Sequence, residues 1–503
     1  MTANAIIFPI IVHLLTAIVL LFLWRKTAIQ RILSIGGNVL ALVLALSLFL
    51  AVRENGILSM QAGGWKAPFG ISFVADMFSS SMVLLTSFSG LAVSVFSAAG
   101  IARARMLYGF FPILHFLLMG LNGAFLTGDI FNLYVWFEVI IIASFVLMTL
   151  GGRKAQIEGS VKYMAMNILA SMFFLTGIGI LYGITGTLNM ADLSLKIEAL
   201  ENRTLADITA IFFIVGFGTK SAIFPLYFWL PSSYHTPPSA VAAIFGGLLT
   251  KVGIYALFRM FTLVFVPDQF LSNVLIVLAV LTILTGTFGA LIKNNIRRML
   301  SYLIVCHIGF MIGGLGMYSE IALTGALFYL FHDMVVKTNV FLIAGLIRKL
   351  GGTMNMDRLG GLYGSYPLLS LLIAVVLFSL AGVPPLSGFW PKIYLLEAGI
   401  MDQYYVLLLA LIVGSFATLY IIANMWAKIC WKRRQEAEDT LPDEFRPLSN
   451  FRKALLVGPI VFLAAISLYI GLGAEDVVSI VKQIAREMKD PSLYIEAVLD
   501  RNL

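Results

Sequence analysis

The chain has 503 residues, of which 60% are hydrophobic and 12% are charged, and its formal net charge is +8. Soluble domains are about half apolar and about a quarter charged, and so few charges cannot cover the surface of a soluble chain this long. The composition therefore excludes a soluble globular protein and predicts an integral membrane protein.

Long apolar runs follow one another along the whole chain. Because a bilayer core about 30 Å thick needs about 20 apolar residues per helix, the sequence predicts an all-α membrane protein with about fourteen spans. These fall at 4–24, 32–52, 75–98, 107–127, 129–150, 162–185, 207–230, 238–262, 271–292, 301–317, 321–347, 367–398, 403–430 and 454–473. The first run has its basic residues after it, so we expect a retained helix and no cleaved signal.

Lysine and arginine alternate between the two sets of predicted loops. The loops after odd-numbered spans hold 21 of them, and those after even-numbered spans hold five, namely Arg53, Lys66, Lys196, Arg203 and Arg259. Cytoplasmic loops carry the excess of basic residues, so both termini are predicted to be extracytoplasmic. The basic charge thus reflects topology, and no nucleic-acid binding is expected.

Two segments near the C-terminus are polar. Residues 431–453 mix both signs of charge with two prolines, which is typical of a solvated cytoplasmic loop. The tail after 475 predicts an amphipathic helix followed by the run PSLYIEAVL. Two interpretations of this tail stay open: a helix on the protein's own surface, and a docking strip for a partner subunit.

Four lysines remain inside the predicted spans: Lys220, Lys251, Lys337 and Lys392. A charge near the bilayer centre costs at least about 2.5–3.5 kcal/mol, so such residues are functional candidates. Among the acidic residues Glu138 lies deepest, with no cation within a helical turn, so its partner must come from another helix. The structural alternatives are ion pairs that join helices and lysines that reach the membrane surface.

The segment YLFHDMVVK places His332 and Asp333 shortly before Lys337. Histidine titrates near neutral pH, which suits a proton relay. Asp333 lies one helical turn before Lys337 and is therefore also placed to neutralise it. Asp333 and His235, which lies in a proline-rich loop, are candidate modulators.

Two predicted spans are interrupted by prolines, and each carries a lysine, Lys220 or Lys392. In lipid, the backbone groups that proline frees are tolerated only where protein or a water-filled cavity satisfies them. Five spans separate the interruptions, so a five-helix repeat maps one onto the other with opposite topology, as in transporters built from inverted repeats. The prolines at these helix breaks are Pro225, Pro231, Pro384, Pro385 and Pro391.

Four segments resemble the antiporter-like family shared by proton-pumping subunits of NADH-quinone oxidoreductase and by Mrp-type cation/proton antiporters. They are TGDIFNLYVWFEVIIIASFVLMTLGG, KSAIFPLYFWLPSSYHTPPSAVAAIFGGLLTKVGIY, YLFHDMVVKTNVFLIAG and LAGVPPLSGFWPK. The similarity extends over about residues 1–475. The FNLYVWFEV run and the closing PSLYIEAVL are most similar to the D-type subunits of the Mrp branch.

This resemblance implies fourteen helices with two inverted five-helix repeats and discontinuous seventh and twelfth helices. The implied divisions are helices 1–3 at 1–106, the first repeat at 107–262, the second at 271–430, the cytoplasmic loop at 431–453, and the last helix with its extracytoplasmic tail at 454–503. It also implies proton-carrying roles for Glu138, Lys220, Lys251 and Lys392. Some relatives read His-x-x-x-Lys on helix eleven, whereas here His332 stands five residues before Lys337, so which of these two is the relay stays open.

The expected function is that of a proton-translocating subunit of a multi-subunit Na⁺/H⁺ antiporter in a bacterial-type cell membrane. The implied partners are other hydrophobic subunits of the Mrp A, B, C, E, F and G types. The alternatives are a proton-pumping subunit of a respiratory or hydrogenase-type complex and a self-sufficient transporter. The sequence has no nucleotide motif, and Cys306 and Cys430 lie apart without metal-ligand neighbours, so neither a cofactor nor a metal is expected.

Overall fold

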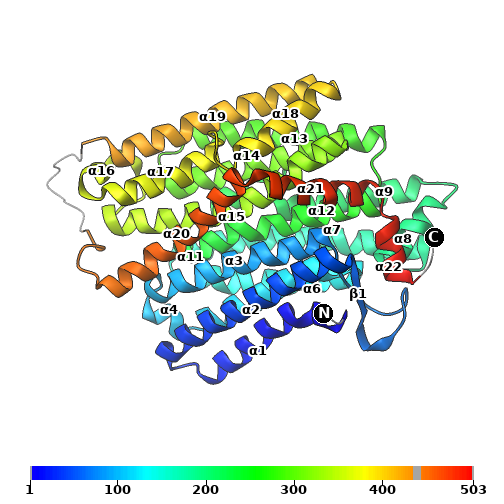
Figure 1. The fold of residues 1–503 in the computed structure, drawn as a ribbon, viewed down its shortest axis with the longest axis horizontal. Coiled ribbons are helices and arrows are strands. Elements are labelled where there is room, and N and C mark those ends of the chain that lie inside the picture. The colour runs from blue at the N-terminus through cyan, green and yellow to red at the C-terminus, as the bar shows by residue number, and fades with distance from the viewer. Residues whose placement is uncertain (1–2, 434–442, 501–503) are drawn as a thin grey trace.

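The structure, a computed structural model, describes residues 3–433 and 443–500. Most of this chain is helical, and the helices run side by side in one elongated bundle (Figure 1). The strands β1 (Leu58–Gln61) and β2 (Ser72–Ala75) form a small antiparallel hairpin beside it. Most of the predicted 431–453 loop, at 434–442, lies outside the described residues.

The first half of the chain builds helices α1 to α12. Their bounds are η1 (Ala3–Ile7), α1 (Phe8–Phe22), α2 (Thr27–Asn55), η2 (Ala62–Gly64), α3 (Met77–Gly100), α4 (Arg103–Leu107), α5 (Phe110–Leu126), α6 (Ile130–Thr149), α7 (Lys154–Thr185), α8 (Met190–Glu198), α9 (Thr204–Ser221), α10 (Trp229–Ser233), α11 (Ser239–Ile244), the π-helical turn η3 (Phe245–Leu249) and α12 (Thr250–Leu263).

The second half builds helices α13 to α22. Their bounds are α13 (Gln269–Leu291), α14 (Ile296–Met317), α15 (Glu320–Gly351), η4 (Met356–Arg358), α16 (Leu362–Ser365), α17 (Pro367–Ala381), α18 (Phe389–Met401), α19 (Tyr405–Cys430), α20 (Asn450–Leu472), α21 (Ala474–Lys489) and α22 (Ser492–Leu499).

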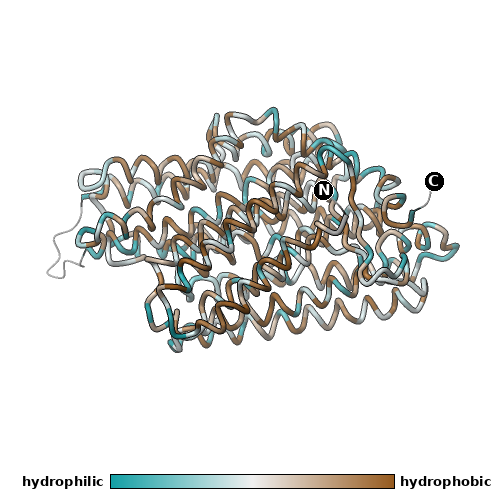
Figure 2. Tube along the Cα trace, turned by 60° about the horizontal axis from the view of Figure 1, so that its bottom comes forward, coloured by the Kyte–Doolittle hydropathy of each residue, from teal (hydrophilic) through white to brown (hydrophobic). Residues whose placement is uncertain are grey.

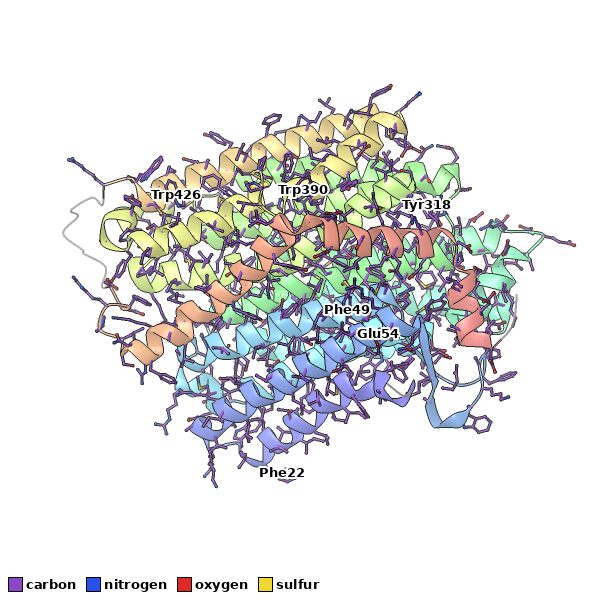
Figure 3. All side chains as sticks on the ribbon, viewed as in Figure 1. Phe22, Phe49, Glu54, Tyr318, Trp390 and Trp426 are labelled. Carbon is purple, nitrogen blue, oxygen red and sulfur yellow. The ribbon has the colours of Figure 1, made fainter. Side chains whose placement is uncertain are left out.

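The described helices have the lengths and compositions of membrane spans. Twelve helical segments are long and apolar enough to cross a bilayer, and α5 and α17 are shorter apolar helices. Large apolar side chains point outward, such as Phe22, which is 86% exposed and lies at the edge of the molecule in Figure 3. Figure 2 shows hydrophobic residues along the helices and hydrophilic residues gathered towards their ends. The predicted class, an all-α multi-pass membrane protein, is confirmed.

Three helical segments form the centre of the bundle. The apolar windows of α15 and of the stretch from α11 to α12 are 100% buried, and that of α14 is 94% buried, against 39–72% for the other candidate spans. These central segments carry Lys251, His332, Asp333 and Lys337. The polar residues that cost most to bury therefore lie where the protein shields them from lipid.

Both predicted interruptions are visible as gaps between helices. Helix α9 ends at Ser221 and α10 begins at Trp229, while α17 ends at Ala381 and α18 begins at Phe389. The residue after each first helix, Ala222 or Gly382, is left-handed, with φ of 63° and 80°. This conformation ends a helix because it turns the chain away from the helical path.

Not every proline assigned to these helix breaks lies in a gap. Pro225, Pro384 and Pro385 do, but Pro231 and Pro391 lie in the first turns of α10 and α18. The first turn of a helix tolerates proline because its N–H groups have no intrahelical acceptor. Pro231 and Pro391 are each the third residue of a helix, so they lie beside the gaps and not in them.

The loop count placed Arg259 in a loop, but the structure places it in a helix. It lies in α12, 7% exposed, and its guanidinium pairs with Asp76 at the start of α3. The count assigned it to the loop because it stands close to the predicted end of its span. One of the five basic residues on that side is therefore a buried charge.

The C-terminal tail folds back on its own chain. Helix α21 lies across α15 (Figure 1), and its apolar side is buried there, at Val477, Val481, Ile484, Ala485 and Met488. Of the two interpretations left open for the tail, its own contacts favour the surface helix. Helix α22 and η1 both pack against β1, so the two ends of the described chain lie on one side of the bundle.

Close helix packing explains one pair of glycines. Gly286 on α13 faces the backbone of Cys306 on α14, and Gly309 on α14 faces the backbone of Ala279 and Ile283 on α13. A Cβ atom at either glycine would overlap main-chain atoms that cannot move independently. Small residues of this kind let helices approach closely in membranes.

Gly286→Ala should therefore destabilise the protein by about 1–3 kcal/mol, since the methyl group forces α13 and α14 apart. Gly179→Ala is the matched control, because nothing lies within 4 Å of a Cβ at Gly179. Thermal unfolding of the two variants in detergent measures the difference. Equal melting temperatures would show that the helix contact is not tight.

Candidate functional site

Glu138 and Lys220 meet through a serine that stands between them. The Ser171 hydroxyl on α7 donates to Glu138 Oε1 on α6 at 2.5 Å, and Lys220 Nζ on α9 donates to Ser171 Oγ at 3.1 Å. One hydroxyl has one proton to donate and two lone pairs that accept. The ammonium, hydroxyl and carboxylate thus form a continuous hydrogen-bonded chain across three helices.

Lys220 lies beside a small internal cavity. Its Nζ is 4.7 Å from the centre of the Phe137 ring, a distance at which the aromatic face attracts a cation. The cavity has a volume of about 20 Å³, and its polar lining comes from Lys220, Asn167, Tyr163 and Tyr234. This is room for one water molecule with several hydrogen-bonding neighbours.

Side chains satisfy main-chain carbonyls next to both interruptions. Trp229 Nε1 donates to the carbonyl of Thr219 at 2.9 Å, near the end of α9. At the second interruption, Lys392 Nζ donates to the carbonyl of Ala381 at 2.8 Å, the last residue of α17. A cation is stabilised at this position because the C-terminal end of a helix carries partial negative charge.

Lys251 has the most complete set of partners among the buried lysines. It follows the π-helical turn η3, and its Nζ lies 2.7 Å from Asp333 Oδ2 on α15 and 2.7 Å from the carbonyl of Gly246 in η3. Asp333 Oδ1 lies 3.1 Å from Nδ1 of His307 on α14. Lys251, Asp333 and His307 are all 0% exposed, so this cluster is isolated from both lipid and water.

Asp333 is therefore not the partner of Lys337, although the two stand one turn apart on the same helix. Its carboxylate turns towards α12 and α14, where the Lys251 ammonium lies 2.7 Å and the His307 imidazole 3.1 Å away. Within the described chain, Nζ of Lys337 has no hydrogen-bond partner and is 0% exposed. An unpaired ammonium is costly to bury, and in this respect Lys337 differs from Lys220, Lys251 and Lys392.

His332 contacts a cluster of three serine hydroxyls. Its Nδ1 lies 2.8 Å from Ser387 Oγ, and Ser387, Ser379 and Ser467 lie 2.7–2.9 Å from one another. Ser379 is on α17, Ser387 is in the second interruption and Ser467 is on α20. His332 thus connects the central helix α15 to the same interruption that Lys392 borders.

His235 lies apart from the buried residues, between α10 and α11. Its Nδ1 is 2.9 Å from the carbonyl of Pro231, and its Nε2 is 3.1 Å from the Arg298 guanidinium. Burial and the neighbouring Arg298 lower the pKa of His235 to about 4. The imidazole is therefore neutral near pH 7 and borders an open cavity of about 310 Å³ with Glu158 and Lys162.

Three polar groups in the site were missed in the sequence analysis. His307 stands in the apolar run SYLIVCHIGFMIGG and carries the same signal as the buried lysines, so it was detectable. Ser171 and Ser387 were not, because serine is common in membrane helices and its polarity is small. Within residues 3–433 and 443–500, no group of three or more His, Cys, Asp or Glu side chains is arranged to hold a metal ion.

The arrangement is suited to moving protons. Carboxylates, amines and imidazoles, groups that can exchange protons, lie on helices α6, α9, α12, α14, α15 and α18, and serine hydroxyls contact Glu138, Lys220 and His332. Their proton affinities depend on partners on other helices, so movement of one helix changes the affinity of the next group.

Comparisons with known proteins agree with one another. A protein-family model described as "NADH:quinone oxidoreductase/Mrp antiporter, TM" matches residues 127–418. The chain is 40% identical over 499 residues to the D subunit of the Na(+)/H(+) antiporter of Alkalihalophilus pseudofirmus, covering 99% of both chains. It is also 40% identical over 497 residues to the protein of the same name in Bacillus subtilis, again covering 99% of both.

Two solved structures share the fold over almost the entire chain. One is described as "Structure of Mrp complex from Dietzia sp. DQ12-45-1b", with a TM-score of 0.90, 28% identity and 99% of both chains covered. The other is the membrane-bound sulfane sulfur reductase, an archaeal respiratory membrane complex, with a TM-score of 0.89 over 99% of this chain and 100% of that one. At 24% identity the second likeness shows the fold alone.

Replacing Asp333 with Asn should destabilise the protein by about 3–5 kcal/mol, because it leaves the Lys251 ammonium buried without its carboxylate. The double variant Lys251→Met with Asp333→Asn should recover most of that loss. Glu158→Gln is the control: Glu158 and its partner Lys162 are 61% and 51% exposed, and a pair at the surface contributes about 0–1 kcal/mol. Denaturation of the purified variants compares them, and a double variant no more stable than Asp333→Asn would contradict the pairing.

Proposed function

Because the chain belongs to the NADH:quinone oxidoreductase/Mrp antiporter family of membrane subunits, we propose that it is the D-type subunit of a multi-subunit Na⁺/H⁺ antiporter. It is a transporter subunit rather than an enzyme, and its partners are the other hydrophobic subunits of an Mrp-type complex. Its own part in the exchange is to carry protons through the membrane.

The hydrogen-bonded chain from Glu138 through Ser171 to Lys220 is the observation that supports this role best. While Glu138 is charged and in contact, it stabilises the ammonium form of Lys220. When Glu138 moves or becomes protonated, that stabilisation is lost and Lys220 releases its proton to the neighbouring cavity. The pair therefore acts as a switch on the proton affinity of Lys220.

The proton then passes through the centre of the bundle. Lys251 lies on α12, which packs against α9, and it is held by Asp333 on α15. Lys337 lies one turn along α15 and has no hydrogen-bond partner within the described chain, so it is able to accept a proton without breaking an ion pair. From there the path continues past His332 and its serine cluster to Lys392.

The proposed architecture is fourteen membrane helices with inverted repeats at 107–262 and 271–430, preceded by helices 1–3 in 1–106. It counts α5 and α17 as spans beside the twelve long segments. Helices α7 and α15 support it, because they occupy equivalent positions and both have 32 residues. So do two isolated backbone bridges at matching places, Asp129 with Asn189 and Asn295 with Asn355.

The same proposal gives the second repeat its discontinuous twelfth helix, α17 and α18, to match α9 and α10 in the first. Residues 431–453 form the cytoplasmic loop, and 454–503 form the last helix with an extracytoplasmic tail. The excess of basic residues in the odd-numbered loops supports this orientation, with both termini outside a bacterial-type cell membrane.

A partner subunit is needed beside α6. Glu138 is only partly buried in the isolated chain, and its neighbours Val135 and Ile142 are 42% and 60% exposed. A carboxylate on an apolar, membrane-facing surface is stable when another protein covers it. The alternative of a respiratory proton pump rests on likeness of fold, whereas the relatives at 40% identity are antiporter subunits.

Glu138→Ala and Lys220→Ala should each abolish Na⁺/H⁺ antiport by the complete complex, because either change removes one end of the switch. The measurement is Na⁺-induced proton movement in vesicles, with assembly checked by co-purification of the other subunits. Lys196→Ala is the control, since the Lys196 side chain is 42% exposed and lies on α8, outside the site. Full activity in an assembled Glu138 or Lys220 variant would refute the proposal.

Ser171→Ala should slow antiport by about tenfold to a hundredfold, because it removes the hydroxyl that links the two charges. Ser171→Thr keeps a hydroxyl on the β-carbon and should retain most of the antiport rate. The initial rates of proton movement distinguish these variants. If alanine and threonine behave alike, the hydroxyl does not connect Glu138 and Lys220 during transport.

A further inference from the structure

A second buried ion pair lies on the same helix as Lys251 and has no place in the path above. Arg259 stands eight residues after Lys251 on α12, about 12 Å farther along the axis. Its Nη1 is 2.6 Å from Asp76 Oδ2, and the two side chains are 9% and 7% exposed. This pair lies near the end of α12, at Leu263, and at the start of α3.

Tyr255 lies between the two cations of α12 along the helix. Lys251, Tyr255 and Arg259 are spaced four residues apart, so their side chains follow one face of the helix. The Tyr255 hydroxyl accepts from Arg259 Nη2 at 3.2 Å and donates to the carbonyl of Phe125 at 2.7 Å. A hydroxyl therefore stands between the central cluster and the end of the helix.

The ion pair borders a cavity beneath the C-terminal tail. The cavity has a volume of about 20 Å³, enough for one water, and is lined by Asp76 and Arg259 and by Glu487, Asp490 and Tyr494 of the tail. Tyr494 on α22 covers the guanidinium, with its ring centre 5.1 Å from Cζ of Arg259. Since α22 packs on β1, this cavity opens on the side that holds both chain ends.

Glu487 is a carboxyl group in this cavity whose pKa is raised. Burial is the largest cause, and the Asp76 carboxylate also raises the pKa, whereas Gln483, which donates to Oε1 at 2.8 Å, and Arg259 oppose the shift. The charged groups facing it are Asp76, Arg259 and Asp490. The neighbouring charges on α21 are engaged elsewhere: Arg486 pairs with Glu320 on α15, and Lys489 donates to the carbonyl of Tyr318, labelled in Figure 3.

We propose that Glu487, Arg259 and Tyr255 form the mouth through which protons exchange between Lys251 and the aqueous phase on the side of the termini. This inference rests on the proposed function. Arg259 stays protonated and paired with Asp76, so within this mouth Glu487 is the group that takes up and releases the proton.

Glu487→Gln in the complete complex tests the mouth, because it keeps the shape and the Gln483 contact but removes the titrating group. We expect the antiport rate to fall about tenfold. We also expect a change in how the rate depends on the pH of the aqueous phase on the side of the termini. Glu475→Gln, an exposed carboxyl on the same helix, should leave both unchanged. Wild-type kinetics in Glu487→Gln would overturn the inference while leaving the proposed function intact.

A second measurement does not depend on transport. Infrared titration of the purified wild-type and Glu487→Gln complexes isolates the carboxyl band of Glu487 as their difference. Protonation at a pH clearly above the usual value for glutamate, about 4.3, supports the mouth. Titration at the usual value overturns it. If the wild-type complex showed no antiport at all, the proposed function would fail, and this titration alone would decide on the mouth.

Discussion

An ammonium group inside an apolar helix bundle is stable only where protein atoms replace its lost water, and the four buried lysines meet this constraint differently. Lys220 has a serine hydroxyl and an aromatic ring, Lys251 a carboxylate and a carbonyl, and Lys392 the last carbonyl of α17. Lys337, within the described chain, has no hydrogen-bond partner. Around α15, Lys251 of α12 and His307 of α14 are the partners of Asp333, and Ser387 of the second interruption is the partner of His332.

The four lysines differ in how strongly their partners stabilise the charged form. Groups held by strong partners keep their charge, whereas a group without one changes protonation state with little rearrangement. In the proposed path, Lys337 is therefore the responsive group of the centre, between the ion pair of Lys251 and the helix end that holds Lys392. The two interruptions also supply partners, since the helix ends beside them leave main-chain carbonyls free to accept hydrogen bonds from side chains.

The sequence was enough to predict the class, the approximate spans and the buried lysines, because lipid imposes length and hydropathy on every helix. It was not enough to predict the pairing. Residues four apart on a helix can interact, and this suggested an ion pair between Asp333 and Lys337. That spacing describes a single helix, however, and Asp333 pairs with Lys251 on another helix, α12. The role of Ser171 could not be predicted, because its hydroxyl bonds to two charged groups that lie on other helices.

Lys251 also couples charge to the shape of its own helix. Its ammonium holds the Gly246 carbonyl, in the π-helical turn η3, and the Asp333 carboxylate at the same time. If the ammonium moves away from one of these acceptors, its contact with the other is strained. Each such contact matters, because a hydrogen bond to a charged group contributes about 1.5–3 kcal/mol. The lysine thus ties the wide turn to the central ion pair, and under the proposed function a proton transfer at this residue would also change the shape of the helix.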